Sequence, residues 1–453
     1  MPGSRQPLHC GCDDFRATSE SRRRRFVGDS QLTRRQVIGL GAGAGLALYA
    51  AQALPLSRAL EAAAADAQAA PDAPVLVAVF LPGGLDLLDS LIPVDDYGAY
   101  ADLHRNIRVD KPPMLRGSAL GIHPSLAQGV GGGIKGLYDA GKLGFLPGID
   151  YPNPNLSHFH SRHFWETGLI SDNDSAGWLG RWLDANGNQD NPLQGMSLSY
   201  DLSAVLRSRS APVASASSPD DAGFYIRGTF GPAFDEAMAT WTALAKARGG
   251  GPGLKAAKRA ALLAKQVGDL LEPYARTNDG DPLASTVAYP AKSGFGDRLR
   301  TLAGLISKPL GIRVATVNAP GDFDTHDDQR NSLAQALPEI SQALGAFQAD
   351  LEARGVADRV LTFVWSEFGR RPHDNDSGTD HGAGGLAWIQ GTRVRPGLLS
   401  EYPSLRDFDE DDNLKVTVDF RTVYASLIEQ WMKTDAGAVL PNAGGLGRIA
   451  VVR

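Results

Sequence analysis

The most informative segment of the chain reads Val75-Leu76-Val77-Ala78-Val79-Phe80-Leu81-Pro82-Gly83-Gly84-Leu85-Asp86. Its first seven residues are all apolar, and Pro-Gly-Gly then interrupts them. A short, uninterrupted apolar run with this many valines predicts a strand that is buried on both faces, as in a parallel sheet. Asp86 then stands just beyond the carboxyl end of the expected strand.

Further apolar runs and helical patterns alternate along the chain. Additional strands are expected at 143–149, 312–317, 360–365 and 386–390, and helices at 157–168, 332–354 and 421–433. This alternation predicts an α/β fold, with a mostly parallel sheet sandwiched by helices.

The stretch 185–310 has a different composition. It holds a Ser/Ala/Pro-rich segment, a Gly-rich break and two amphipathic helical patterns, at 208–221, 249–253, 232–247 and 254–273. We expect this stretch to be an insertion or cap on the sheet rather than an independent domain.

The amino-terminal region has the order of an export signal. A polar, Arg-rich segment ends in Arg34-Arg35, an uncharged stretch spans 37–54, and an Ala-rich segment follows at 62–70. This order predicts a signal peptide, and the paired arginines resemble a twin-arginine signal. We therefore expect a leader at 1–70 and a mature domain at 71–453.

Export by this route would make the twin-arginine translocase a transient partner and place the mature protein in the periplasm or outside the cell. No stable membrane span is expected after cleavage. An uncleaved amino-terminal anchor is the alternative, because eighteen uncharged residues are borderline for crossing a bilayer.

Composition restricts the chemistry of the mature domain. The chain has 453 residues, with 45 Lys and Arg against 51 Asp and Glu. Nine arginines and six acidic residues fall within 1–70, so the remainder carries a net charge of −9. An acidic body has no electrostatic footprint for nucleic acid. Both cysteines, Cys10 and Cys12, lie in the leader, so a site in the body must use oxygen and imidazole.

Polar residues gather just after the expected strands. Ser157 and His158 follow the second strand, Asp324 and His326 the third, and Glu367, Arg370, Asp380 and His381 the fourth. In a parallel sheet, functional loops lie at the carboxyl ends of the strands. We therefore expect these side chains and Asp86 to share one site.

Several of these residues suit a metal ion. Asp324 and His326 are two apart, so in an extended segment they point to the same side. Asp380 and His381 are adjacent, and the neighbouring Gly378 and Gly382 allow an irregular backbone. Carboxylates with imidazoles and no thiolates favour Zn or Mn, while Mg, Ca and Fe are also compatible. One or two divalent ions are expected.

Ser157 is the candidate nucleophile, because a helix amino-terminus favours an anion and a metal beside a hydroxyl would activate it. Arg370 could pair with a phosphate or sulfate oxygen, and His158 could assist proton transfer. Two simpler interpretations stay open: Ser157 as a plain helix N-cap, and Asp86 as a turn or cap residue. His104 has no evident partner in the sequence.

The segments 79–86, 153–159 with 165–168, 323–326 with Gln329, and 366–370 with 379–382 together resemble the DUF1501 family, over about residues 75–450. The resemblance implies an exported protein with an alkaline-phosphatase-like or sulfatase-like core. In that superfamily, Asp86, Asp324, His326, Asp380 and His381 would be the metal ligands and Ser157 the nucleophile.

The chain departs from the superfamily pattern in three ways. The Asp324-x-His326 spacing is short, no Cys-x-Pro-x-Arg motif for a formylglycine exists, and no histidine follows His381. A second metal site would therefore be absent or completed by Glu367. An ordinary sulfatase is disfavoured.

These observations predict an exported metal-dependent hydrolase that acts on phosphate or sulfate esters, of small molecules or polymers. The alternative is a non-catalytic exported binding or assembly protein that keeps the fold, because the carboxyl-terminal histidine ligand is missing.

Overall fold

A nine-stranded sheet forms the centre of the protein. The computed structural model describes residues 56–222 and 231–453. The strands follow the order β12-β4-β11-β8-β1-β7-β5-β6, and β13 pairs with β4. Their bounds are β1 (Val75–Phe80), β4 (Leu143–Asp150), β5 (Gly195–Ser197), β6 (Ala214–Ser215), β7 (Val314–Asn318), β8 (Val360–Trp365), β11 (Gly385–Gln390), β12 (Gly397–Leu398) and β13 (Val418–Asp419).

Most neighbouring strands run parallel. Strand β1 lies between β7 and β8 and is parallel to both, whereas β11 runs antiparallel to β4 and β8. The predicted α/β class with a mostly parallel sheet is confirmed. Each of the five expected strands is present, with ends shifted by at most two residues.

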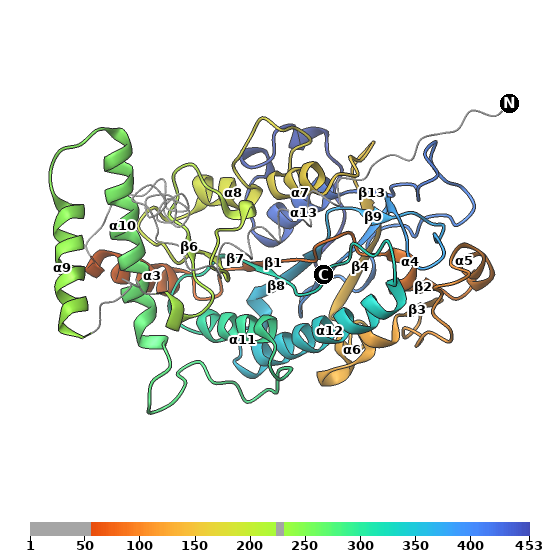
Figure 1. Cartoon of the computed structure of the whole chain (residues 1–453), viewed down its shortest axis with the longest axis horizontal. Helices are drawn as coiled ribbons and strands as arrows, with labels where there is room; N and C mark the ends of the chain where they lie inside the picture. Colours follow the sequence, from red (N-terminus) through yellow and green to blue (C-terminus); the bar gives the residue numbers. More distant parts are fainter. Residues whose placement is uncertain (1–55, 223–230) are drawn as a thin grey trace, which may run out of the picture.

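Helices cover both faces of the sheet (Figure 1). One layer contains α7 (His158–Thr167), α8 (Trp178–Asn186) and α13 (Phe420–Ser426), and the other contains α6 (Gly133–Asp139), α11 (Gly294–Ile306) and α12 (Gln329–Ala353). Alternate residues of β1 divide between the two layers: Val75, Val77 and Val79 pack in the α11–α12 core, and Leu76, Ala78 and Phe80 in the α7–α13 core. This double burial explains the uninterrupted apolar run.

Short elements gather near the carboxyl ends of the central strands. They are α4 (Leu87–Ser90), β2 (Leu91–Pro93), α5 (Tyr97–Leu103), β3 (Leu120–Ile122), β9 (Gly369–Arg370) and β10 (His381–Gly382). Strands β2 and β3 form one small antiparallel pair, and β9 and β10 form another. The second pair places Arg370 directly opposite His381.

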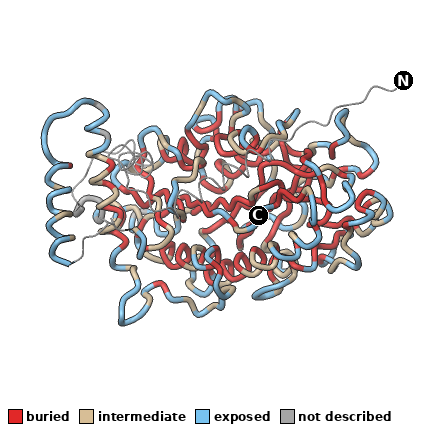
Figure 2. The backbone as a smooth tube through the Cα atoms, viewed as in Figure 1, coloured by how far each residue is buried: buried red, intermediate tan, exposed pale blue. Residues whose placement is uncertain are grey.

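A helical hairpin projects from the opposite end of the molecule (Figure 1). It consists of α9 (Pro232–Lys246) and α10 (Pro252–Leu271), which match the two amphipathic patterns of the sequence. Its outer surface is largely exposed (Figure 2). The hairpin belongs to the stretch 185–310, which was expected to be an insertion or cap but also contributes β5, β6 and α11 to the sheet and its helix layer. The hairpin carries none of the predicted site residues.

The predicted signal peptide lies largely outside the described residues. Its described end is α3 (Leu56–Ala69), where Asp66 accepts hydrogen bonds from the side-chain amides of Asn188 and Asn191 at 2.8 and 3.0 Å. Across 56–222 and 231–453, no helix combines the length and the apolar character needed to cross a bilayer.

Candidate functional site

Three imidazole rings converge on the carboxylate of Asp324. Asp324 Oδ1 lies 2.9 Å from His381 Nε2 and 3.1 Å from His326 Nε2, and Asp324 Oδ2 lies 3.5 Å from His158 Nε2. The two Nε2 atoms of His326 and His381 are 3.1 Å apart. His158, Asp324 and His381 are buried, while His326 is partly exposed. We call these four residues the Asp324 cluster.

The other ring nitrogen of each histidine contacts an oxygen atom. Nδ1 of His158 lies 2.9 Å from Glu367 Oε1, Nδ1 of His326 lies 2.8 Å from Asp380 Oδ1, and Nδ1 of His381 lies 2.8 Å from the Leu156 carbonyl. An oxygen at Nδ1 favours the tautomer with its proton there, which turns the Nε2 lone pair inward. This is how metal-binding histidines are commonly oriented.

The cluster perturbs the pKa values of its members. Burial opposes ionisation of Asp324, yet hydrogen bonds to the three histidines hold its pKa below the usual range. Burial lowers the pKa of His158, but its bonds to Asp324 and Glu367 prevail and raise it to about 9. The pKa of His381 is lowered, chiefly by burial. Such opposed shifts in one place are typical of functional sites.

Glycines allow the β1 loop to press against the cluster. Gly83 has a φ of +109°, and a Cβ atom there would lie 2.3 Å from the backbone nitrogen of Asp324. The Gly83 N–H donates to both Glu367 oxygens, at 3.0 and 3.1 Å. A side chain at this position would therefore displace the segment that carries Asp324.

Arg370 joins the loops of the site from inside. Its guanidinium donates to the carbonyls of Gly83, Gly84, Phe323 and Thr379 and to Asp324 Oδ1. The side chain is buried. The sequence suggested a contact with a phosphate or sulfate oxygen. Because all three guanidinium nitrogens already donate to the protein, the arrangement favours a positioning role for Arg370.

Ser157 borders the cluster at the start of α7. The preceding carbonyl, of Leu156, contacts His381, and the following residue is His158. Ser157 occupies the N-cap position and is half-buried, but its hydroxyl makes no capping hydrogen bond to the helix backbone. The plain capping interpretation is therefore not what the structure shows.

Asp380 and Glu367 lie behind histidines rather than at the centre. Asp380 is exposed and contacts His326 Nδ1, and Glu367 contacts His158 Nδ1. Both were expected as direct ligands, whereas their positions suit residues that orient ligands. His158, expected to assist proton transfer, instead aims Nε2 at Asp324. It therefore supplies a third imidazole to the Asp324 cluster.

Asp86 is separate from the Asp324 cluster. It lies six residues beyond the end of β1, where it caps α4 by accepting from Asp89 N at 3.1 Å. Together with Asp89 and His104 it forms a second group, and all three side chains are buried. His104 was expected to have no partner, which was wrong: its Nδ1 lies 2.7 Å from Asp89 Oδ1.

Hydroxyl and amide groups connect the two groups of residues. Gln329 Nε2 donates to Asp86 Oδ2 and Asp89 Oδ2, at 2.8 and 2.9 Å. The Gln329 oxygen accepts from the hydroxyls of Thr325 and Thr379, at 2.9 and 2.6 Å. Thr325 follows Asp324 in sequence and Thr379 precedes Asp380. Gln329 therefore links the group around Asp86 to the segments that carry these two aspartates.

Both groups have the donor atoms of a divalent metal site. His158, Asp324 and His381 offer ligand atoms that all lie within 4.8 Å of one another, and so do Asp86, Asp89 and His104. Imidazole with carboxylate suits Zn, Mn or Fe, and Ca instead takes six to eight oxygens. The prediction of one or two metal ions therefore has a structural basis.

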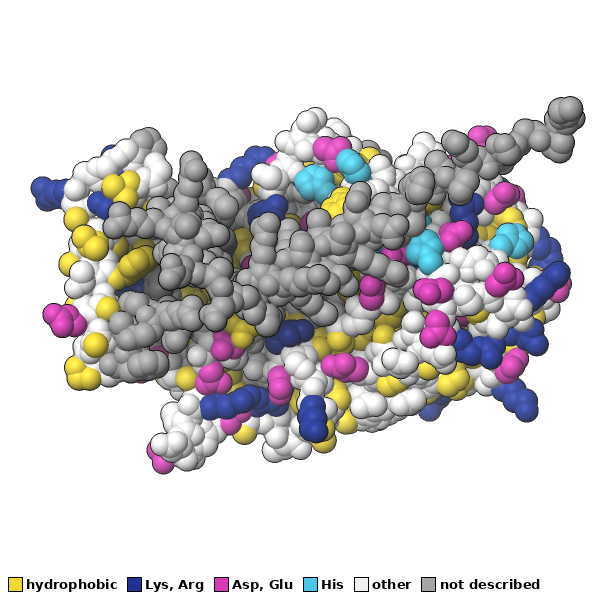
Figure 3. All heavy atoms as spheres, viewed as in Figure 1, with side chains coloured by type: hydrophobic (Ala, Val, Ile, Leu, Met, Phe, Trp, Pro, Cys, Tyr) yellow, Lys and Arg dark blue, Asp and Glu magenta, His cyan; other side chains and the backbone are white. Residues whose placement is uncertain are grey.

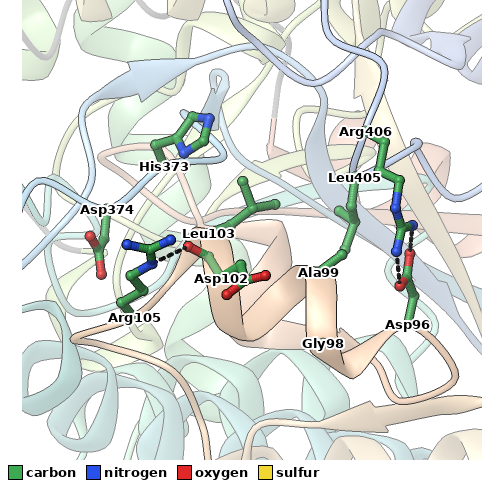
Figure 4. A pocket seen from close by; sticks show the side chains of 10 residues that line it. All are labelled: Asp96, Gly98, Ala99, Asp102, Leu103, Arg105, His373, Asp374, Leu405 and Arg406. Atoms are coloured by element: carbon green, nitrogen blue, oxygen red, sulfur yellow. Dashed lines mark hydrogen bonds and ion pairs between the residues drawn. The ribbon is translucent and has the colours of Figure 1, made fainter.

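The surface outside these groups carries charges of both signs. On the face shown in Figure 3, basic and acidic side chains are interspersed. A hollow of about 750 Å³ lies beside α5, with Arg105, His373 and Asp374 on one side and Arg406 and Asp96 on the other (Figure 4). None of the predicted site residues lines it.

Comparison with known proteins identifies a family. A family model described as "Protein of unknown function (DUF1501)" matches residues 147–442. None of the curated proteins compared with the chain matches it.

Solved structures show distant similarity. A crystal structure of Ps i-CgsB in complex with k-i-k-neocarrahexaose has 12% sequence identity and a TM-score of 0.37. A crystal structure of Ps i-CgsB without that ligand in its description has 8% identity and a TM-score of 0.36. Each alignment covers 83% of this chain and 75% of the other.

Proposed function

The chain belongs to the DUF1501 family, whose description gives no activity, and we propose a function from the geometry of its site. We propose that the protein is an exported metal-dependent hydrolase of phosphate or sulfate esters. Its substrate is the ester of a small molecule or a polymer, and its core is related to the alkaline phosphatase and sulfatase superfamily.

One observation carries the proposal: three Nε2 atoms converge on Asp324 while an oxygen holds each Nδ1. The Nε2 atoms of His326 and His381 are also only 3.1 Å apart. Imidazole nitrogens and a carboxylate that meet at one point, with each ring held at its other nitrogen, form a suitable ligand set for a divalent cation.

His158, Asp324 and His381 would hold the ion, and His326 would close its partly exposed side. A bound divalent cation supplies Lewis-acid stabilisation of the negative charge that develops on ester oxygens. Asp380 and Glu367 keep the imidazoles oriented, and Arg370 keeps the loops together.

Ser157 is the proposed nucleophile. Its hydroxyl stands at the amino-terminus of a ten-residue helix, where the dipole and free N–H groups favour an anionic group. The hydroxyl oxygen would attack phosphorus or sulfur, the ester oxygen would leave as an alcohol after taking up a proton, and water would then release the bound group.

The non-catalytic alternative rested on the missing histidine after His381. Because His158 supplies a third imidazole from another segment, the specific reason for that alternative is weaker, and hydrolysis is the function that the site supports best.

The test uses the full mature chain, loaded with Zn²⁺ or Mn²⁺, and nitrophenyl phosphate, bis-nitrophenyl phosphate and nitrophenyl sulfate at acidic, neutral and alkaline pH. We expect turnover of at least one ester, and a loss of about a thousandfold or more in Ser157→Ala. Ser307→Ala is the matched control, since Ser307 is also half-buried at a helix end but precedes β7 at the amino end of that strand.

Two outcomes would count against the proposal in different ways. A metal-loaded protein that cleaves none of these esters would favour the binding or assembly function. An active Ser157→Ala variant would keep the hydrolase and remove Ser157 as its nucleophile.

We also propose export by the twin-arginine translocase to the periplasm or beyond. The paired Arg34-Arg35 before the uncharged stretch supports this route. Replacement of both by Lys should retain the protein in the cytoplasm, as cell fractionation would show; unchanged export would contradict the route.

A further inference from the structure

We propose that Asp86 and His104 are ligands of a second divalent transition-metal cation, enclosed within the fold, and that Asp89 orients the His104 ring. The ligand atoms offered by the three residues lie within 4.8 Å of one another. This proposal does not depend on the hydrolase function, because it concerns a separate, occluded group.

The orientation of His104 is the first argument. Its Nδ1 lies 2.7 Å from Asp89 Oδ1, which also accepts from the Tyr100 hydroxyl at 2.7 Å. A carboxylate at Nδ1 fixes the ring and leaves Nε2 as the coordinating nitrogen, as in carboxylate–histidine–metal arrangements.

The state of His104 Nε2 is the second argument. This atom has no hydrogen-bond partner among the described residues, and the whole side chain is 0% exposed. It faces Asp86 Oδ2 across 3.9 Å, which is too long for a hydrogen bond. A bridging cation spans such a gap, because metal–nitrogen and metal–oxygen bonds are each about 2.0–2.2 Å.

Charge balance is the third argument. Asp86 and Asp89 are 2% and 1% exposed, and the other polar side chains that contact them, from Tyr100, Gln329 and Thr379, are neutral. Buried net charge is strongly unfavourable, and a divalent cation with a neutral imidazole would balance both carboxylates.

Gln329 can complete the ligand set. The orientation of a side-chain amide follows from its hydrogen bonds, and its present partners Thr325 and Thr379 bear hydroxyls that can donate or accept. A reversed amide would keep both contacts and present its oxygen to the cation. The mixed imidazole and oxygen set favours Zn²⁺, Mn²⁺ or Fe²⁺ over Ca²⁺.

The position of the group suggests a bracing role. Asp86 follows β1, His104 ends α5 and Gln329 begins α12. A cation here would tie these elements together behind the Asp324 cluster. The hollow beside α5 is lined by Leu103 and Arg105 but not by His104 (Figure 4), so the proposed cation is set apart from that surface.

Zinc stoichiometry tests the proposal. The full mature chain is stripped with chelator, checked for folding by circular dichroism and titrated with Zn²⁺ alone, with elemental analysis of the complex. We use His381→Gln as the background, which removes one proposed ligand of the Asp324 cluster. His381→Gln/His104→Gln should bind one equivalent of zinc less than this background.

Asp89→Asn provides a milder variant that keeps a hydrogen-bond acceptor at Nδ1. We expect it to retain one equivalent but to bind zinc about 10–100-fold more weakly. His160→Gln is the matched control, since its ring nitrogen also contacts an aspartate but at the surface; its zinc affinity should not change.

The proposal is overturned if folded His381→Gln/His104→Gln binds as much zinc as its parent, or if the His381→Gln parent binds none. Should the double variant fail to fold, an unchanged zinc affinity in Asp89→Asn overturns it. The zinc stoichiometry does not depend on whether the protein hydrolyses esters. A failure of the proposed hydrolase function can therefore be told apart from a failure of the proposed second metal site.

Discussion

Replacement of Glu367 by Gln should destabilise the metal-free protein at acidic pH but hardly at alkaline pH. Glu367 is buried and accepts from Gly83 N and His158 Nδ1 at 3.0 and 2.9 Å. Gln has the same shape and keeps an acceptor oxygen, so the main loss is the negative charge that stabilises the His158 imidazolium.

The structure sets the size of the effect. The pKa of His158 rises from 6.5 to about 9, which corresponds to about 3 kcal/mol at about 1.4 kcal/mol per unit. Asp324 and Glu367 share this stabilisation. Glu367→Gln should therefore lower the free energy of unfolding by about 1–2 kcal/mol where His158 is protonated.

The sign follows from proton linkage. A histidine with a raised folded pKa contributes stability that is fully present below pH 6.5 and is lost as the pH rises through about 9. The assay is urea denaturation of chelator-treated protein at about pH 5.5 and about pH 9.5, on either side of that window. Glu166→Gln is the control, because Glu166 is a buried glutamate on α7, the helix that carries His158, and pairs with Arg162 instead.

Equal destabilisation at both pH values would refute this reasoning, since it would mean that shape or hydrogen bonding, rather than charge, explains the role of Glu367. The metal-loaded protein gives a second readout. Loss of the carboxylate behind His158 should weaken zinc binding by about 10–100-fold, and an unchanged affinity would exclude His158 as an oriented ligand.

Two further substitutions test the packing around the site. Gly83→Ala should lower the free energy of unfolding, measured by urea denaturation, by about 2–5 kcal/mol, because of positive-φ strain and overpacking against Asp324 N. Gly117→Ala is the control, since Gly117 has a φ of +67° but open space around it, and it should show the strain alone. Equal losses of stability in the two variants would contradict the steric argument. Asp150→Asn should stabilise the protein at neutral pH, because burial raises the pKa of Asp150 well above its usual value, so the wild type loses stability as pH rises above 3.8. That gain should vanish below about pH 4 in thermal denaturation, and a gain that persists in acid would exclude the titration of Asp150 as its cause.

The sequence predicted the fold well because the buried strands appear in it as uninterrupted apolar runs. The apolar runs that became β1 and β8 are buried along their whole length, so no polar face obscures them. The antiparallel direction of β11 was not predictable, because its apolar pattern is the same in either direction.

The site was predicted in composition but not in arrangement. Strand ends brought Asp324, His326 and His381 together as expected. The roles of His158 and Glu367 depended on rotamers that spacing does not specify. The group around His104 was missed because α4, β2 and α5 lie between Asp86 and His104, and no sequence period marks the two residues as neighbours. The Asp86–Asp89 spacing of three was the available signal.

The contacts that build the Asp324 cluster join distant parts of the chain. His158 and Glu367 are separated by 209 residues, and Gly83 and Glu367 by 284. Contacts of such separation form only after the entropic cost of closing long loops has been met, and they are characteristic of late steps in folding. Stoichiometric metal uptake would therefore serve as a measure of complete folding, since a chain with native helices but an unclosed sheet would lack the cluster altogether.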